Sequence, residues 1–324
     1  FGNQLPYLDA IRVSYIKEKK NELMEFSKGN SDLVYRFPLE MIDEIVDYKH
    51  QLKPAYKGFQ LQFKPQMALQ YYGFQHQGKI FNNANVRKAF CYAIDRQKLC
   101  DFTLKGTGFP AIYGTVPPGT GTFDSKTVKG FTYDPAKARE YMAQAGFPKG
   151  KGFPKVTLEL NSGGSRNSQV AEALKKMIEE TLGIQVDLLI VPWAQHTEAV
   201  ETAKIDFYRL GWSADYPDAE NFLNLFHSKY VPDDITQKTY INSFRYKNKV
   251  FDSYFNEAVA TVDEAKRNAL YTKADQQVID DAVVLPIYYD VDYRLLQPNV
   301  RNCPQNAMEQ RDFSEVYFVP MNGK

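Results

Sequence analysis

Residues 155–212 read KVTLELNSGGSRNSQVAEALKKMIEETLGIQVDLLIVPWAQHTEAVETAKIDFYRLGW. Hydrophobic residues alternate with other residues over 156–160 and then recur at helical spacing over 170–178, and Gly183 is placed to end the helix. The same order follows once more along the chain, with a second strand at 184–190, a helix at 193–204 and a third strand at 205–212. The stretch therefore predicts the succession β-α-β-α-β.

This succession indicates an α/β fold. Strands that alternate with helices favour a mainly parallel sheet joined by right-handed crossovers. Open sheets of this kind bind ligands beyond the carboxyl ends of their strands. Those ends lie at Asn161 onward, at Pro192–Trp193 and at Gly211–Asp215. A binding site is therefore expected first at these three positions.

Further elements are predicted on both sides of this stretch. Apolar residues at helical spacing over 86–94 indicate one helix. Asp134 as N-cap and Gly146 as C-terminal stop bound a second helix. A third helix is expected over 263–281, followed by an apolar strand over 283–289.

Residues 1–55 differ from the middle of the chain. They contain a strand-like segment, Ala10–Ile16, and a helix-like segment, Lys19–Lys28, but no segment that would complete a sheet with them. A strand needs neighbours to bond its backbone. These residues therefore suggest a fragment of a second domain.

The composition is that of an ordinary globular chain without a dominant charge. Its 324 residues allow about two domains, and 40 Lys and Arg against 39 Asp and Glu give a formal net charge of +1. That balance provides no long-range field to attract nucleic acid or an anionic bilayer. The longest apolar runs are far shorter than the roughly 20 residues of a membrane-spanning helix. The three cysteines give no disulfide framework.

The segment Arg209–Asp218 places a cation, an aromatic ring and a carboxylate at the end of the third predicted strand. Such a group of side chains can hold a zwitterion: Asp215 would take an ammonium, Arg209 a carboxylate, and Trp212 would pack against the apolar part between them. The alternative is structural, with Asp215 capping a turn before Pro217 and Trp212 in the core.

The loop Asn161–Arg166, with the sequence NSGGSR, joins a predicted strand to a helix N-terminus. It resembles a generic anion cradle, but it lacks the glycine and lysine spacing of phosphate-binding loops. Most loops of this type only cap the helix. Arg166 could instead point at the carboxylate of a ligand.

An enzymatic interpretation rests on acidic residues near the same strand. Asp215 and Asp218, with Glu220, are candidates for a general acid and base pair of a hydrolase. Acidic residues in a proline-containing turn are more often solvated, and no nucleophile motif occurs in the chain. The chain has four histidines without the spacing of metal ligands, so neither a metal nor a cofactor is expected. These histidines are His50, His76, His196 and His227.

Several segments taken together in their order resemble one family, the extracytoplasmic solute-binding proteins of peptide ABC importers, of the oligopeptide- and dipeptide-binding type. The resemblance covers essentially the whole chain, and the ordered set is more specific than any one segment. The segments are Pro6–Asp9, Phe26–Asp32, Asn85–Phe90, Ala93–Arg96, Pro117–Gly119, Tyr133–Ala138, Ala145–Pro148, Gly211–Asp218 and Pro286–Tyr289.

The resemblance implies a periplasmic-binding-protein-like architecture of two lobes with mainly parallel sheets and crossing hinge strands. By similarity, residues 56–289 form lobe II, and residues 1–55 and 290–324 belong to lobe I. The chain departs from the family in lacking the N-terminal stretch that builds most of lobe I. The first lobe is therefore expected to be incomplete, with a truncated product as the interpretation.

The resemblance also assigns roles to individual residues. Asp215 matches the acidic residue that pairs with the amino terminus of a peptide, and Trp212 and Trp193 match aromatic residues that line the pocket. Arg166 matches a position that holds the carboxyl terminus in dipeptide binders, and Arg209 matches one used for longer peptides. Asn161 begins the same loop as Arg166.

By this resemblance the chain is a non-catalytic receptor that captures short peptides outside the cytoplasm and delivers them to an ABC importer permease. It is expected to be a monomer in the periplasm or on the cell surface, where a lipid anchor at an absent N-terminus is one option. Alternatives are a receptor of the same family for an oligosaccharide or another small solute, and the hydrolase based on Asp215 and Asp218.

Overall fold

A computed structural model of the protein describes residues 4–47 and 49–320. The chain divides into two compact units. Unit 1 comprises residues 1–66, 105–107 and 291–324, and unit 2 comprises residues 67–104 and 108–290. Two long strands, β2 (Gln60–Phe74) and β7 (Val284–Leu296), have residues in both units. All the candidate site residues lie in unit 2.

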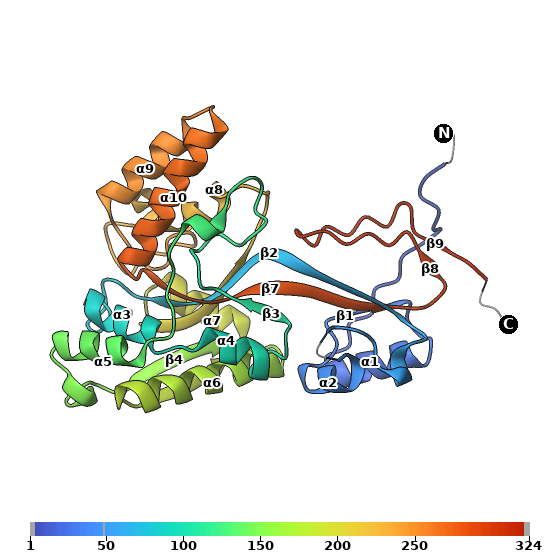
Figure 1. The fold of residues 1–324 in the computed structure, drawn as a ribbon, viewed down its shortest axis with the longest axis horizontal. Coiled ribbons are helices and arrows are strands. Elements are labelled where there is room, and N and C mark those ends of the chain that lie inside the picture. Colours follow the sequence, from blue (N-terminus) through green and yellow to red (C-terminus); the bar gives the residue numbers. More distant parts are fainter. Residues whose placement is uncertain (1–3, 48, 321–324) are drawn as a thin grey trace. The chain divides into compact units, whose positions relative to one another are not determined.

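The strands of unit 2 confirm the predicted β-α-β-α-β succession (Figure 1). In the main sheet the strand order is β1-β7-β2-β6-β4-β5, and β3 pairs with β7. The bounds of the other strands of this sheet are β1 (Leu33–Tyr35), β3 (Gly108–Pro110), β4 (Val156–Asn161), β5 (Val186–Val191) and β6 (Phe207–Ser213). Helices α6 (Ser165–Leu182) and α7 (Trp193–Glu201) are the two crossovers of this succession.

The sheet is mixed, which corrects the prediction of a mainly parallel sheet. Strand β4 runs parallel to both β5 and β6, as helical crossovers require. Strand β6 is antiparallel to β2, and both β1 (Leu33–Tyr35) and β3 are antiparallel to β7. The parallel part is therefore limited to the segment that alternates strands with helices.

Helix α6 buries most of the apolar face that its spacing predicts. In α6 the residues Val170, Leu174 and Ile178 are buried, and Gly183 ends the helix in the left-handed conformation. The Asp134 side chain accepts from the backbone of Lys137, as an N-cap does. The other helices are α3 (Ala84–Tyr92), α4 (Arg96–Lys98), α5 (Pro135–Gln144), α8 (Glu220–Leu223), α9 (Lys249–Val259) and α10 (Glu264–Asp280). Helices α9 and α10 pack against each other (Figure 1).

Unit 1 has a small core of its own. Helix α1 (Lys19–Ser27) confirms the helix expected there and buries Leu23 and Phe26. The other elements are α2 (Ile42–Ile45), β1, and the two short strands β8 (Val300–Arg301) and β9 (Tyr317–Phe318), which pair with each other.

The strand expected over Ala10–Ile16 is wrong for this structure. These residues belong to neither sheet, and Ile11, Val13 and Tyr15 are exposed, Tyr15 at 96%. Alternating hydrophobicity gives the segment a strand pattern, but a strand forms only where a neighbouring edge bonds its backbone.

Candidate ligand-binding site

The turn between β4 and α6 places Arg166 in the first turn of the helix. The backbone leaves β4 at Asn161 and passes through Gly164, which has φ of +105°. Residues with a side chain rarely adopt that conformation, so glycine allows the abrupt change from strand to helix. Arg166 is therefore carried on a rigid helix at the carboxyl end of β4, where the sequence placed it.

The charge of Arg166 is balanced inside unit 2. Its Nη2 lies 3.1 Å from Oδ1 of Asp290, and its Nε donates to the Tyr288 hydroxyl at 3.2 Å. The guanidinium also lies over the Tyr288 ring, 5.2 Å from its centroid. Asp290 is only 1% exposed. A buried carboxylate needs such a partner, so this pair is part of the folded framework.

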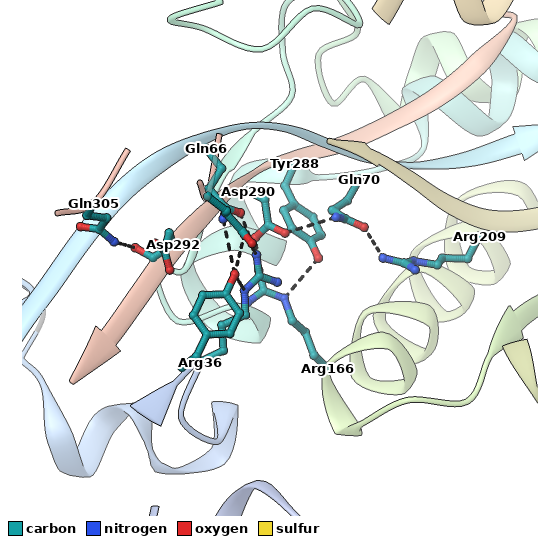
Figure 2. Close-up of polar contacts among 11 residues, drawn as sticks. Arg36, Gln66, Gln70, Arg166, Arg209, Tyr288, Asp290, Asp292 and Gln305 are labelled. Atoms are coloured by element: carbon teal, nitrogen blue, oxygen red, sulfur yellow. Dashed lines mark hydrogen bonds and ion pairs between the residues drawn. The ribbon is translucent and has the colours of Figure 1, made fainter. Parts of the chain in front are cut away.

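Arg209, on β6, has a different environment. Its Nη1 donates to Oδ1 of Asn161 at 3.2 Å, and its Nη2 contacts Oε1 of Gln70. Both acceptors are neutral amides. Figure 2 shows Gln70 between Arg209 and Asp290. Nε2 of Gln70 donates to Oδ2 of Asp290 at 3.2 Å. Within the described part of the chain, no carboxylate forms an ion pair with Arg209, so its positive charge is available to an anion.

Gln70 fits beside β6 because residue 211 is a glycine. Gln70 lies opposite Gly211 in the antiparallel pairing of β2 with β6. A Cβ added to Gly211 would lie 2.6 Å from Oε1 of Gln70, too close for any side chain. Gly211 thus lets Gln70 reach both Asp290 and Arg209.

Strand β6 extends beyond the part of it that pairs with β4. The pairing covers only two positions and ends at Glu159 opposite Tyr208. Strand β6 continues to Ser213, with β2 along its other side. In the described residues, the stretch of β6 after Tyr208 therefore has one edge without a neighbouring strand, the unoccupied edge.

Backbone hydrogen bonds identify the groups that point toward this edge. Ala214 N donates to Met67 O on the side of β2, whereas the carbonyl of Arg209 bonds to a side chain of α7 on the other side. Because alternate residues of a strand direct their backbone groups to opposite edges, Gly211 and Ser213 face the unoccupied edge. An extended ligand could add there as a further strand.

Both tryptophans of the chain line one cavity of about 120 Å³ in unit 2. Its walls come from α7, β6 and a loop that carries Tyr240. Trp212 is half-buried, and the centroids of its indole and of the Tyr240 ring are 6.2 Å apart. Trp193 remains 53% exposed. An aromatic wall of this kind accepts apolar groups of varied shape.

Asp215 lies in the turn directly after β6 and is exposed. The buried side chain of Asn221 connects it to the cavity: Oδ1 of Asn221 accepts from the Trp212 indole at 2.9 Å and from the Asp215 backbone at 3.2 Å. No lysine or arginine among the residues that the structure describes pairs with Asp215. Its carboxylate is therefore available to a cation.

The neighbouring acidic residues serve structural contacts. Asp218 lies 3.7 Å from the Arg267 guanidinium and accepts from the backbone of Glu220 at 2.9 Å. The carboxylate of Glu220 accepts from the Tyr216 hydroxyl. Burial and this contact raise the pKa of Tyr216 to about 12. This arrangement does not pair Asp215 and Asp218 as an acid and a base.

The described ranges of the chain also bear on metal sites and membrane spans. They contain no cluster of three or more His, Cys, Asp or Glu side chains that could hold a metal ion. Nor do they contain a helix with the length and apolar character needed to cross a membrane.

The structure brings the six expected residues together as two groups on β6 and its neighbours. In the first group, Arg209 contacts Asn161, and Gln70 links Arg209 to Asp290, the partner of Arg166. In the second group, Trp193 and Trp212 line the cavity, and Asn221 links Trp212 to the backbone of Asp215. Sequence reasoning missed Gln70, Asn221, Tyr288 and Asp290. Tyr288 and Asp290 lie on or next to a predicted strand, but their pairing with Arg166 depends on the fold. Gln70 lies in a segment that was not predicted as a strand.

Known proteins resemble the chain along nearly its full length. The oligopeptide-binding protein OppA of Bacillus subtilis is 26% identical over 315 residues, which are 96% of this chain and 55% of the relative. The periplasmic oligopeptide-binding protein OppA of Escherichia coli is 27% identical over 301 residues, 91% of this chain and 51% of the relative. The chain thus spans about half the length of the curated relatives it matches.

A solved structure and a family model agree with these relatives. The periplasmic binding protein DppA of Helicobacter pylori, in complex with peptide STSA, matches with a TM-score of 0.79 at 22% identity, over 94% of this chain and 56% of that one. The fold is therefore a mixed α/β fold shared with periplasmic peptide-binding proteins. The family model of the bacterial extracellular solute-binding proteins, family 5, middle region, matches residues 1–233. The chain belongs to the bacterial extracellular solute-binding proteins of family 5.

Proposed function

We propose that the chain forms the ligand-binding part of a receptor that captures short peptides outside the cytoplasm and delivers them to the permease of an ABC importer. The relatives named as oligopeptide-binding proteins support a peptide as the ligand. The observation that carries the proposal lies in this chain: Arg209 within β6 and Asp215 just after it present opposite charges without ionic partners among the described residues.

These two charges suit the two ends of a peptide. Asp215 would accept hydrogen bonds from the terminal ammonium, and Arg209 would donate to the terminal carboxylate. Between them, the unoccupied edge of β6 would pair with the peptide backbone through Gly211 and Ser213. Such main-chain bonds are independent of the peptide sequence. The receptor would therefore accept many sequences.

The peptide side chains would alternate between the two faces of β6. On one face, Trp212 and Trp193 provide the cavity. On the other face lie Gly211 and the side chain of Arg209, because successive residues of a strand point to opposite sides. Every second side chain would thus enter the tryptophan-lined cavity.

The environments of the two arginines favour a ligand longer than a dipeptide. Arg166 is already paired with buried Asp290, whereas Arg209 contacts only neutral amides. At about 3.3 Å per residue, β6 from Arg209 to Ser213 covers ~13 Å, roughly the length of four extended residues. We therefore propose Arg209 as the residue that holds the carboxylate and a preference for tri- to pentapeptides.

The assignment to lobes remains part of the proposal. Lobe II would comprise residues 56–289, and residues 1–55 and 290–324 would belong to an incomplete lobe I. The division into two compact units, with boundaries at residues 66 and 290, supports it. The two long strands β2 and β7 would be the crossing hinge strands, and the receptor would be a monomer in the periplasm or at the cell surface.

Two other functions predict different behaviour. A hydrolase based on Asp215 and Asp218 would turn over peptides or glycosides, but Asp218 is paired with Arg267. We therefore expect binding without turnover. A receptor for a neutral sugar would tolerate the loss of the Asp215 charge, because it has no ammonium to bind.

Intrinsic tryptophan fluorescence tests the proposal directly, because the chain has only two tryptophans and both line the cavity. Titration of this chain of 324 residues with a tetrapeptide should change the emission and yield a dissociation constant. Asp215→Asn should weaken binding about tenfold or more, through the loss of a charge-assisted contact. Asp233→Asn makes the same charge change at an exposed position and is the control. Equal affinities of the two variants would remove the proposed ammonium site.

A further inference from the structure

A buried histidine and a buried glutamate lie beside the unoccupied edge of β6. His196, on α7, is 0% exposed, and Glu159, on β4, is 5% exposed. Nδ1 of His196 lies 2.8 Å from Oε1 of Glu159, and Nε2 lies 2.7 Å from the carbonyl oxygen of Arg209. The His196 side chain of α7 is thus bonded to both β4 and β6.

The two oxygens that face the His196 ring indicate where its protons lie. A carbonyl oxygen only accepts, so Nε2 of His196 carries a proton and donates it to Arg209. Glu159 also presents an oxygen to Nδ1, and two lone pairs at 2.8 Å would repel each other. One proton therefore lies between His196 and Glu159, and it holds the imidazole in its orientation.

The carbonyl that His196 occupies is the first one on the unoccupied edge. Pairing with β4 ends at Tyr208, so the backbone groups of Arg209, Gly211 and Ser213 follow in turn along that edge. Because the His196 ring stands at the Arg209 carbonyl and donates to it, we expect an added strand to begin pairing at Gly211. The histidine thereby limits where a peptide backbone can bind.

The same contact fixes one wall of the cavity. Trp193 lies three residues before His196 on α7, with their ring centroids 6.1 Å apart. Thr197 and Val200 of the same helix also line the cavity, opposite Trp212 of β6. The bond from His196 to the Arg209 carbonyl joins α7 to β6 at this point, so it maintains the spacing between the two walls.

We infer that His196, oriented by Glu159, is a positioning residue that sets the register of the bound peptide on β6 and holds Trp193 against it. This inference rests on the proposed function, since it deepens the description of the same site. The inference predicts that His196 and Glu159 control which peptide lengths bind, in addition to the stability of the fold.

Four variants of the full-length polypeptide separate these effects. His196→Phe keeps an aromatic ring but loses both hydrogen bonds, and Glu159→Leu leaves the imidazole without its partner. Glu159→Gln retains a side-chain donor for Nδ1 and should rescue. His227→Phe is the matched control, because His227 is another buried histidine with two hydrogen bonds and does not line the cavity.

Dissociation constants are measured for tri-, tetra- and pentapeptides by tryptophan fluorescence. We expect His196→Phe and Glu159→Leu to weaken binding about tenfold and to change the ratio of affinities between lengths, because the Arg209 carbonyl becomes available. Glu159→Gln and His227→Phe should stay within about threefold of the wild type. A wild-type length profile in His196→Phe, or the same change in His227→Phe, would overturn the inference.

The imidazole ¹⁵N spectrum of the ligand-free protein gives a readout that does not depend on peptide binding. It should show a slowly exchanging proton on Nε2 of His196 in the wild type. If the wild type binds no peptide but shows this proton, the proposed function fails while the positioning contact stands. A rapidly exchanging Nε2 proton would contradict the positioning contact whatever the peptides do.

Discussion

The two arginines of the site show how environment decides the role of a residue type. Both were candidates for holding a carboxylate: Arg166 lies just beyond the carboxyl end of β4, and Arg209 lies within β6. The guanidinium of Arg166 pairs with buried Asp290 and lies over Tyr288, whereas that of Arg209 meets only amide oxygens. The first arginine therefore stabilises the fold, and the second is the one proposed to bind ligand.

This difference predicts losses of stability of different size for two matched substitutions. Arg166→Met leaves Asp290 without that ion pair, so the free energy of unfolding should fall by about 3 kcal/mol. Arg209→Met loses bonds to neutral amides, and its free energy of unfolding should fall by about 1 kcal/mol. Urea denaturation measures both values.

Peptide titration of the same pair completes the comparison. Arg209→Met should lose its preference for a free carboxylate over an amidated terminus, whereas folded Arg166→Met should keep it. The interpretation would be wrong if Arg166→Met were the more stable variant or if it alone lost carboxylate discrimination.

At the residue scale, the sequence could place the six candidate residues in one region, while their role in binding stays a prediction. They all lie in or directly after elements of the β-α-β-α-β stretch, so topology is sufficient to place them together. These residues are Asn161, Arg166, Trp193, Arg209, Trp212 and Asp215. Their partners Gln70 and Asp290 come from strands more than 70 residues away in the sequence. Which of two arginines meets a buried carboxylate depends on that long-range packing, and no local pattern contains it.

At the scale of elements, a half-buried histidine connects the two long strands of the sheet. His76 follows β2, and its Nε2 donates to the carbonyl of Val283, directly before β7, at 3.0 Å. Burial and the positive charge of Arg87 lower the pKa of His76 to about 3. The imidazole is therefore neutral when the protein is folded at ordinary pH.

This histidine should make the folded state sensitive to acid. In the unfolded chain His76 gains a proton below pH ~6.5, whereas the folded state resists protonation down to a pKa of about 3. The contribution of His76 to stability is thus present above pH ~6.5 and is lost as the pH falls. Between pH 7 and pH 5 the wild type should lose about 2 kcal/mol more than His76→Gln.

The measurement compares urea denaturation of the two proteins at several pH values. Glutamine keeps a donor for the Val283 carbonyl, so the variant is the proper reference for the titration alone. Parallel curves for the wild type and His76→Gln would show that His76 does not carry this acid sensitivity.

The elements themselves were predictable where periodicity is strong. The spacing of apolar residues located helices α6 and α10 and the strands β4, β5 and β6. Asp134 marked the start of α5. The antiparallel part of the sheet was missed because β2 was not predicted as a strand, so the strand expected over 283–289, which covers the first part of the fully buried β7, had no antiparallel partner in the prediction. The segment Ala10–Ile16 has the opposite property, a strand pattern without an edge to pair with.

At the scale of the whole molecule, the family assignment gives the context in which these parts act. The chain belongs to the bacterial extracellular solute-binding proteins of family 5 and spans about half of its curated relatives. The proposed contacts for the peptide termini and the cavity nevertheless all lie in unit 2. The central claim is that this unit holds a peptide by both of its charged ends.

The most direct test measures the melting-temperature shift of the full-length polypeptide with one tetrapeptide in four forms: free, amino-acetylated, carboxyl-amidated and modified at both ends. Binding to the folded state at a hundredfold excess over the dissociation constant stabilises it by about 2.7 kcal/mol. The account predicts a clear shift with the free peptide, a smaller shift with either single modification and none when both ends are blocked. Equal shifts with all four forms would contradict it, as would the absence of a shift with any peptide.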